Sequence, residues 1–184
     1  MEFDPRRYGD RVVRILALDG AGHRLIPFVA TGCAGEVAAA LNHETPEVLF
    51  PDAFRPRAAM AGLWLYFSGF EQAHALAQDD HTTEGSLWHA ILHRMEPDAG
   101  NSGYWYRMAG PHVTHEALAT EALGIVSRYP GSGFQPGQPW DPFEFVQFCE
   151  RARQQPASPA AQAALEIQRA EWQLLFDYCA RVED

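Results

Sequence analysis

Basic residues are scarce in this sequence, and lysine is absent. The 184 residues include 14 basic side chains, all arginine, against 24 acidic ones, which gives a formal net charge of −10. A nucleic-acid partner would need a basic surface to neutralise its phosphates, and no basic run occurs in the chain. The composition therefore predicts a soluble protein with no nucleic-acid partner.

Cysteine and long apolar runs are scarce as well. The three cysteines, Cys33, Cys149 and Cys179, lie far apart and form no CxxC or other metal-binding spacing. The opening MEFDPRRYGDR is too polar for a signal peptide, and no apolar run approaches the roughly 18 residues that span a bilayer. Together with the odd number of cysteines, these absences predict a cytoplasmic protein without a membrane partner.

Strand signals are confined to the first thirty residues. A run rich in β-branched residues at 12–18 precedes the turn dipeptide Asp19-Gly20, so we expect residues 1–30 to form an extended or short β N-terminal arm. Beyond Pro27 helix signals dominate. We therefore predict a single all-α domain over residues 1–184, in which the Gly/Pro-rich segment 130–140 is an internal linker.

Helix start and stop signals divide the rest of the chain into about seven helices. Favourable caps such as Thr82, Asp141 and Ser158 mark the starts, and Gly110 marks one of the ends. The short connections predict stacked antiparallel helix hairpins, which resemble tetratricopeptide packing. A clean repeat is not expected, because such arrays repeat at about 34 residues and no such period is present.

A polar strip runs along the helix expected after Thr82, in a region that holds six of the eight histidines. Successive helical residues advance by about 100°, so the apolar residues share one arc, the expected buried face: Leu87, Trp88, Ile91, Leu92 and Met95. His89, His93 and Glu96 then lie side by side at the edge of this face. Ala90 and Arg94 fall on the opposite side.

This strip has the residue types of a metal site. Two histidines at i and i+4 can bind one divalent ion, and Glu96 one turn later completes a facial triad. The preceding helix offers Glu71 and His74 at i and i+3, a spacing that helical bundles use for metal ligands. If the two helices are neighbours, Glu71, His74, His89, His93 and Glu96 would bind an ion such as Zn²⁺, Fe²⁺ or Mn²⁺ in a metal-dependent enzyme.

The same groups also suit a metal-free pocket for a small anionic molecule. The sequence in and after the strip is dense in arginine and histidine: Arg94, Arg107, His112 and His115. Guanidinium and imidazole groups bind carboxylates or phosphates. On this interpretation, which we consider the best, the protein binds or converts a small molecule. The residues expected to line one pocket between helices are His74, His89, His93, Glu96, Arg107 and His112.

A third interpretation assigns no active site. Histidines at the edge of a core also hydrogen-bond loop carbonyls, Glu96 can pair with Arg94 or Arg107, and Asp98 and Asn101 are preferred helix caps. In zinc proteases a glutamate directly follows the first of two such histidines, and no glutamate follows His89 here. The chain would then be a helical protein-interaction module. The sequence leaves the reaction, the oligomeric state and the choice between these interpretations open.

The central segment resembles a bacterial and fungal family of uncharacterised proteins. The stretches GLWLYFSGFEQAHALAQ and EGSLWHAILHRMEPDAGNSGYWYRMAGPH match its pattern Trp-His-x-Ile-x-His-Arg-x-Glu-Pro-Asp-x-x-Asn-x-x-Tyr-Trp-(Phe/Tyr)-Arg over roughly residues 62–112. The chain departs from the family at Met95 and Met108, where the family favours other residues, often arginine. The resemblance implies a shared helical core and a shared polar strip, and it implies no reaction.

Overall fold

The computed structural model describes residues 3–29 and 31–182, and these residues form an all-α structure. They contain two short 3₁₀-helices, η1 (Pro5–Tyr8) and η2 (Gly20–Gly22), and no strand beyond one isolated bridge between Ala53 and Val182. The α-helices are α1 (Asp10–Ala17), α2 (Gly35–Leu41), α3 (Pro46–Leu49), α4 (Pro56–Tyr66), α5 (Phe70–Gln78), α6 (Thr83–Met95), α7 (Ala99–Ala109), α8 (Thr114–Arg128), α9 (Pro142–Ala152) and α10 (Pro159–Ala180). The predicted fold class is therefore confirmed.

The N-terminal arm is where the sequence-based prediction is wrong. Residues 10–17 form the helix α1 and not an extended or β segment. Val12, Ile15 and Leu16 follow the spacing i, i+3 and i+4, which places all three on one helix face, and that face is buried in the main apolar core. Burial of this face outweighs the preference of β-branched residues for strands.

The predicted helix boundaries are largely confirmed, because capping side chains define them. Thr82 accepts a hydrogen bond from the Gly85 amide at 3.1 Å, and Ser158 accepts one from the Ala161 amide at 3.1 Å. Asp141 accepts from the amide of Phe143 at 2.8 Å. Each cap satisfies amides that have no partner within the first turn of the helix.

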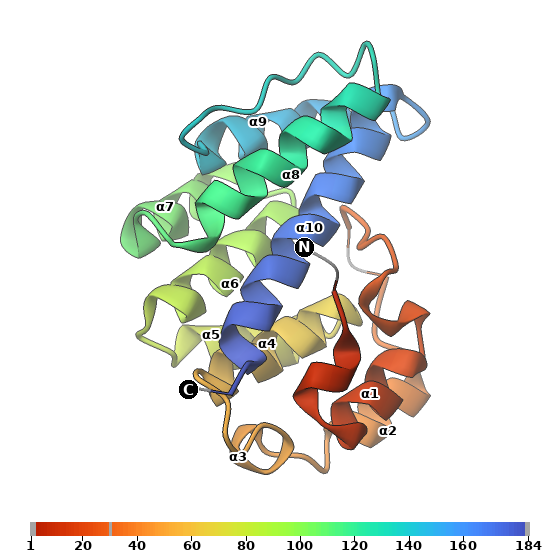
Figure 1. The fold of residues 1–184 in the computed structure, drawn as a ribbon, viewed down its shortest axis with the longest axis vertical. Coiled ribbons are helices and arrows are strands. Elements are labelled where there is room, and N and C mark those ends of the chain that lie inside the picture. Colours follow the sequence, from red (N-terminus) through yellow and green to blue (C-terminus); the bar gives the residue numbers. More distant parts are fainter. Residues whose placement is uncertain (1–2, 30, 183–184) are drawn as a thin grey trace.

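Helices α4 to α7 stack as neighbours in chain order, as expected for consecutive hairpins (Figure 1). The long helix α10 crosses this stack and contacts α4, α8 and α9 (Figure 1). Helix α8 packs mainly against α10 and not against α9, so the hairpin pattern ends at α7. The segment between α8 and α9 contains no helix, and its Phe134 stacks on Phe148 of α9 with ring centroids 4.3 Å apart.

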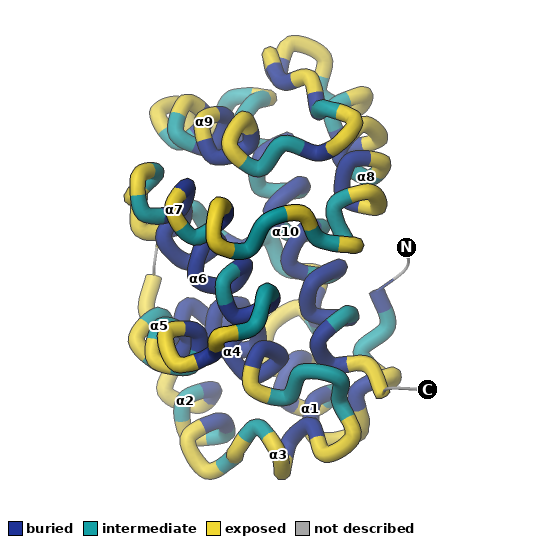
Figure 2. The backbone as a smooth tube through the Cα atoms, turned by 90° about the vertical axis from the view of Figure 1, so that its left-hand side faces the viewer, coloured by how far each residue is buried: buried dark blue, intermediate teal, exposed yellow. Residues whose placement is uncertain are grey.

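Helix α10 joins two apolar clusters. Trp172, Phe176 and Cys179 belong to the larger one, with α1 to α6, whereas Ala164 and Ile167 belong to the smaller one, with α8 and α9. Figure 2 shows α4, α6 and α10 as the buried elements inside a more exposed outer layer. Within the described residues, no helix is both long and apolar enough to cross a membrane.

Helices α4 and α6 approach each other closely at Gly62. A Cβ atom at this position would lie 2.5 Å from Cζ2 of Trp88, a side chain that is 1% exposed and has no room to move. The carbonyl of Gly62 also accepts a 2.7 Å hydrogen bond from Nε1 of Trp172 on α10. The absence of a side chain at Gly62 therefore sets the distance between α4 and α6.

We expect Gly62→Ala to lower the free energy of unfolding by about 1–3 kcal/mol, because overpacking forces buried groups apart. Gly124→Ala in α8 is the matched control, since a Cβ there meets nothing within 4 Å. That control should stabilise the helix by about 0.5–1 kcal/mol. Urea unfolding of both variants would check this, and a Gly62→Ala variant as stable as Gly124→Ala would contradict the close approach.

Candidate functional site

Helix α6 is buried on all sides and carries most of the predicted site residues. His89 is 1% exposed and His93 is 6% exposed, although the sequence placed them only at the edge of the core. Arg94, expected on the side opposite the apolar face, is 0% exposed. The reason is that α5, α7 and α4 cover α6 on different sides, which the sequence of one helix does not reveal.

Three histidines come together between α5 and α6. Nε2 of His74 on α5 lies 3.1 Å from Nε2 of His89 on α6. The rings of His89 and His93, one helical turn apart, are stacked with centroids 4.9 Å apart. One ring nitrogen from each residue lies within 4.8 Å of the others. We call these three residues the histidine cluster.

Neighbouring side chains hold the rings in place. The indole of Trp105 on α7 stacks on His89 at a centroid distance of 3.9 Å. A carboxylate oxygen of Glu96 lies 3.1 Å from Nδ1 of His93, and the Asn101 amide nitrogen lies 3.1 Å from Nε2 of the same ring. The orientation of the cluster therefore depends on α5, α6 and α7 together.

The environment keeps the two α6 imidazoles neutral. Burial and, to a lesser extent, repulsion from the adjacent His74 and His93 together lower the pKa of His89 to about 4. Burial also lowers the pKa of His93, although the nearby Glu96 acts in the opposite direction. Neutral imidazoles carry a free nitrogen lone pair, which is the form that binds metal ions.

The residues predicted for the metal site are only partly brought together. His74, His89 and His93 form the cluster, which confirms that the two helices are neighbours. Glu71 is exposed and does not belong to it. Among the described residues, Glu96 pairs with His93 and with neither Arg94 nor Arg107.

The residues predicted for one anion pocket lie in two places. Arg107 and His112 line a separate cleft of about 730 Å³ between α7, α8 and the start of α9, and none of the cluster histidines lines it. We call this space the α7–α9 cleft. The single pocket expected from the sequence is therefore not formed.

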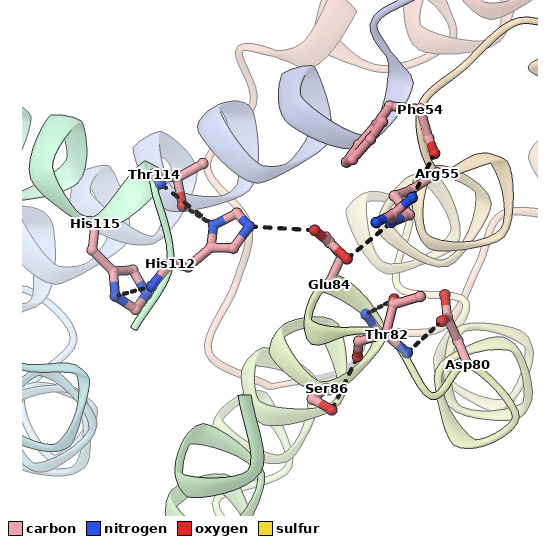
Figure 3. A network of polar contacts seen from close by, with 10 residues as sticks. Phe54, Arg55, Asp80, Thr82, Glu84, Ser86, His112, Thr114 and His115 are labelled. Atoms are coloured by element: carbon pink, nitrogen blue, oxygen red, sulfur yellow. Dashed lines mark hydrogen bonds and ion pairs between the residues drawn. The ribbon is translucent and has the colours of Figure 1, made fainter. Parts of the chain in front are cut away.

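His112 is also part of a polar network that connects α6 to the start of α8 (Figure 3). Its Nε2 lies 3.5 Å from Glu84, and Arg55 donates a 3.2 Å hydrogen bond to the other oxygen of that carboxylate. Burial alone would raise the pKa of Glu84, but the hydrogen bonds from His112 and Arg55 outweigh it and lower the pKa to about 2. The ionised Glu84 therefore fixes one side of the His112 ring.

A second buried network was missed at the sequence level. Arg94 forms an ion pair with Glu171 on α10 and donates a 2.8 Å hydrogen bond to the hydroxyl of Tyr106 on α7. The Tyr106 hydroxyl donates to Glu171 at 2.8 Å, and Gln168 accepts from Arg94 at 3.4 Å. One signal was available, because Gln168 shares the apolar stripe of the last helix with Trp172, one turn away.

Chemically, the histidine cluster offers neutral nitrogen donors to an ion, and the cleft offers an apolar space with a few polar groups. Comparisons with protein-family models, with curated proteins and with solved structures give no match. The resemblance of residues 62–112 to a bacterial and fungal family therefore stays a prediction. The function has to be argued from the two sites themselves.

The histidine cluster predicts a pH dependence of stability in the metal-free protein. An unfolded chain binds a proton at His89 below about pH 6.5, whereas the folded protein does so only near pH 4. The unfolded state therefore binds more protons in this window, and the free energy of unfolding falls as the pH falls from 6.5 to 4. Urea unfolding in the presence of a chelator should show a smaller fall for His89→Gln. His81→Ala is the control, because His81 is exposed. If the free energy of unfolding falls between pH 6.5 and 4 as much in His89→Gln as in this control, the assignment is contradicted.

The Arg94 network predicts a large stability effect of a single substitution. Arg94→Met leaves Glu171 buried without its partner, so we expect a loss of about 3–5 kcal/mol in the free energy of unfolding. Arg128→Met removes the exposed partner of Glu166, also on α10, and should cost at most about 1 kcal/mol. The double variant Arg94→Met/Glu171→Leu should recover part of the loss. Equal losses in Arg94→Met and Arg128→Met would show that the buried pair has no special role.

Proposed function

We propose that the protein binds a divalent transition-metal ion, Zn²⁺ in the first place, through His74, His89 and His93. The observation that supports this most directly is the convergence of three ring nitrogens within 4.8 Å of one another. Two of the residues are buried and come from one helix, and the third comes from a neighbouring helix. Rigid elements of this kind hold ligands more accurately than loops do.

The spacing of the nitrogens fits an ion after small ring movements. Zn–N bonds of about 2.0–2.1 Å in a tetrahedral site place ligand nitrogens about 3.3 Å apart. The separation between His74 and His89 is 3.1 Å, close to this value. The other separations are at most 4.8 Å, and ring rotations that shorten them would bring all three nitrogens to the ion.

Glu96 supports the site without being a ligand. Its carboxylate lies against Nδ1 of His93, which leaves Nε2 of that ring for the ion. A carboxylate behind a ligating histidine fixes its tautomer and raises its basicity. At Nε2 an ion would replace the present contact with the Asn101 amide nitrogen.

The donor set selects among metal ions. All three donors are imidazoles, and the cluster contains no carboxylate. Imidazole nitrogen suits Zn²⁺ and Fe²⁺, whereas Mg²⁺ and Mn²⁺ favour carboxylate and water oxygens. We therefore expect Zn²⁺ to bind much more tightly than Mn²⁺.

Three protein ligands leave one position of a tetrahedral ion for water, which is the arrangement of catalytic zinc sites. His74 is the least buried of the three ligands, so we expect solvent to reach the ion from the α5 side. Zn²⁺ in such a site lowers the pKa of its bound water and makes it a nucleophile at neutral pH. We infer a metal-dependent enzyme of the hydrolytic class.

Zinc binding should be measured on protein purified without a histidine tag and stripped with a chelator. Titration against a chromogenic zinc chelator should show one ion per chain. His89→Gln/His93→Gln should weaken binding by more than the roughly 10–100-fold that loss of a supporting residue causes. Glu96→Gln should weaken zinc binding by a factor within that 10–100-fold range.

His43→Ala/His81→Ala is the matched control, because it removes two exposed histidines and leaves the cluster intact. Its zinc affinity should equal that of the unmodified protein. The proposal fails if the unmodified chain binds no zinc above the level of His89→Gln/His93→Gln. It also fails if the control variant loses binding to the same extent.

A further inference from the structure

The α7–α9 cleft has the size and lining of a small-molecule site. Its volume of about 730 Å³ lies within the range of roughly 300–1,000 Å³ typical of ligand pockets. Tyr106, Trp140 and Phe143 contribute aromatic surface, and Pro111 and Pro142 add further apolar surface. Such a lining favours a flat, mostly apolar molecule, because burial of its surface is favourable and aromatic rings pack well against one another.

Two of the lining residues carry N–H groups that have no partner in the described part of the chain. Trp140 is 6% exposed, and its Nε1 is shielded from solvent and makes no hydrogen bond. The Arg107 side chain is exposed and forms no ion pair or hydrogen bond among the described residues. Its Cζ lies 5.9 Å from the centroid of the Phe143 ring. Because the Trp140 N–H is shielded, the Arg107 guanidinium is the one of these two donors that a ligand in the cleft can reach.

His115 adds a third donor of defined tautomer. Burial lowers its pKa, so the ring is neutral at pH 7. Nδ1 accepts a 3.3 Å hydrogen bond from the backbone amide of His112 (Figure 3), and the ring proton therefore sits on Nε2. The cleft thus presents imidazole and guanidinium N–H groups, of which only the guanidinium is charged.

One positive charge fits a monoanion better than a phosphate. Glu116 also lines the cleft, and its carboxylate repels a dianion more strongly than a monoanion. The net charge of −10 acts in the same direction over longer distances. We propose that the α7–α9 cleft binds a monocarboxylate with an aromatic or similarly flat apolar body, its carboxylate held by Arg107 and its body packed against the aromatic lining. None of the three cluster histidines lines this cleft, so it is separate from the proposed zinc site.

Titration calorimetry with 2-naphthoate tests this proposal, with 2-naphthamide and inorganic phosphate as comparison ligands. The protein is kept metal-free with a chelator, so that the histidine cluster cannot bind the carboxylate through an ion. We expect saturable binding of 2-naphthoate, weaker binding of the amide by about 10-fold, and no competition by phosphate.

Two variants locate the site. Arg107→Gln should weaken 2-naphthoate binding by about 10-fold or more, because it removes a charge-assisted hydrogen bond. Trp140→Phe keeps an aromatic ring in the lining, so it should weaken binding by less than Arg107→Gln does. Thermal unfolding of Trp140→Phe should show a folded protein, since the N–H has no partner in the chain to lose.

Arg14→Gln is the control, because Arg14 is an exposed arginine on α1, outside the cleft. Its affinity for 2-naphthoate should match that of the unmodified protein. The proposal is overturned if 2-naphthoate does not bind, or if Arg107→Gln binds it as tightly as Arg14→Gln does. Equal affinity for the amide would overturn the carboxylate assignment, and so would displacement by phosphate at equal concentration.

Discussion

The buried ion pair between Arg94 and Glu171 is the interaction on which the rest of the structure depends. Charges removed from water are tolerated only when partners surround them, and here Tyr106 and Gln168 supply the additional hydrogen bonds. These groups come from α6, α7 and α10, so the three helices have to keep one relative position. Glu171 also lies on α10 between Ile167 of the smaller apolar cluster and Trp172 of the larger one.

Helix α7 separates the two proposed sites and contributes to both. Trp105 stacks on His89 in the histidine cluster, whereas the next residue, Tyr106, contacts the Arg94–Glu171 pair and lines the cleft. Adjacent residues of a helix point about 100° apart, so one helix between two sites presents a different face to each. The buried pair that holds α7 against α6 and α10 therefore also determines the shape of both sites.

Much of the local structure could be predicted from single residues. The caps at Thr82 and Asp141 act through neighbouring amides, so short sequence patterns were sufficient to place the helix starts. The proximity of His89 and His93 also follows from helix geometry alone. Residues 10–17 were predicted wrongly, because strand preference at Val12 and Ile15 is weak compared with burial of a whole helix face.

The sequence by itself determined the all-α class, most helix boundaries and the polar strip on α6, since these depend on contacts within a few residues. Only the tertiary structure decided what that strip meets. It brought His74 against His89 and left Glu71 exposed, because the orientation of α5 on α6 follows from packing along both helices. It also buried Arg94 and assigned Arg107 to a different cleft, since helices distant in sequence cover α6 from several sides at once.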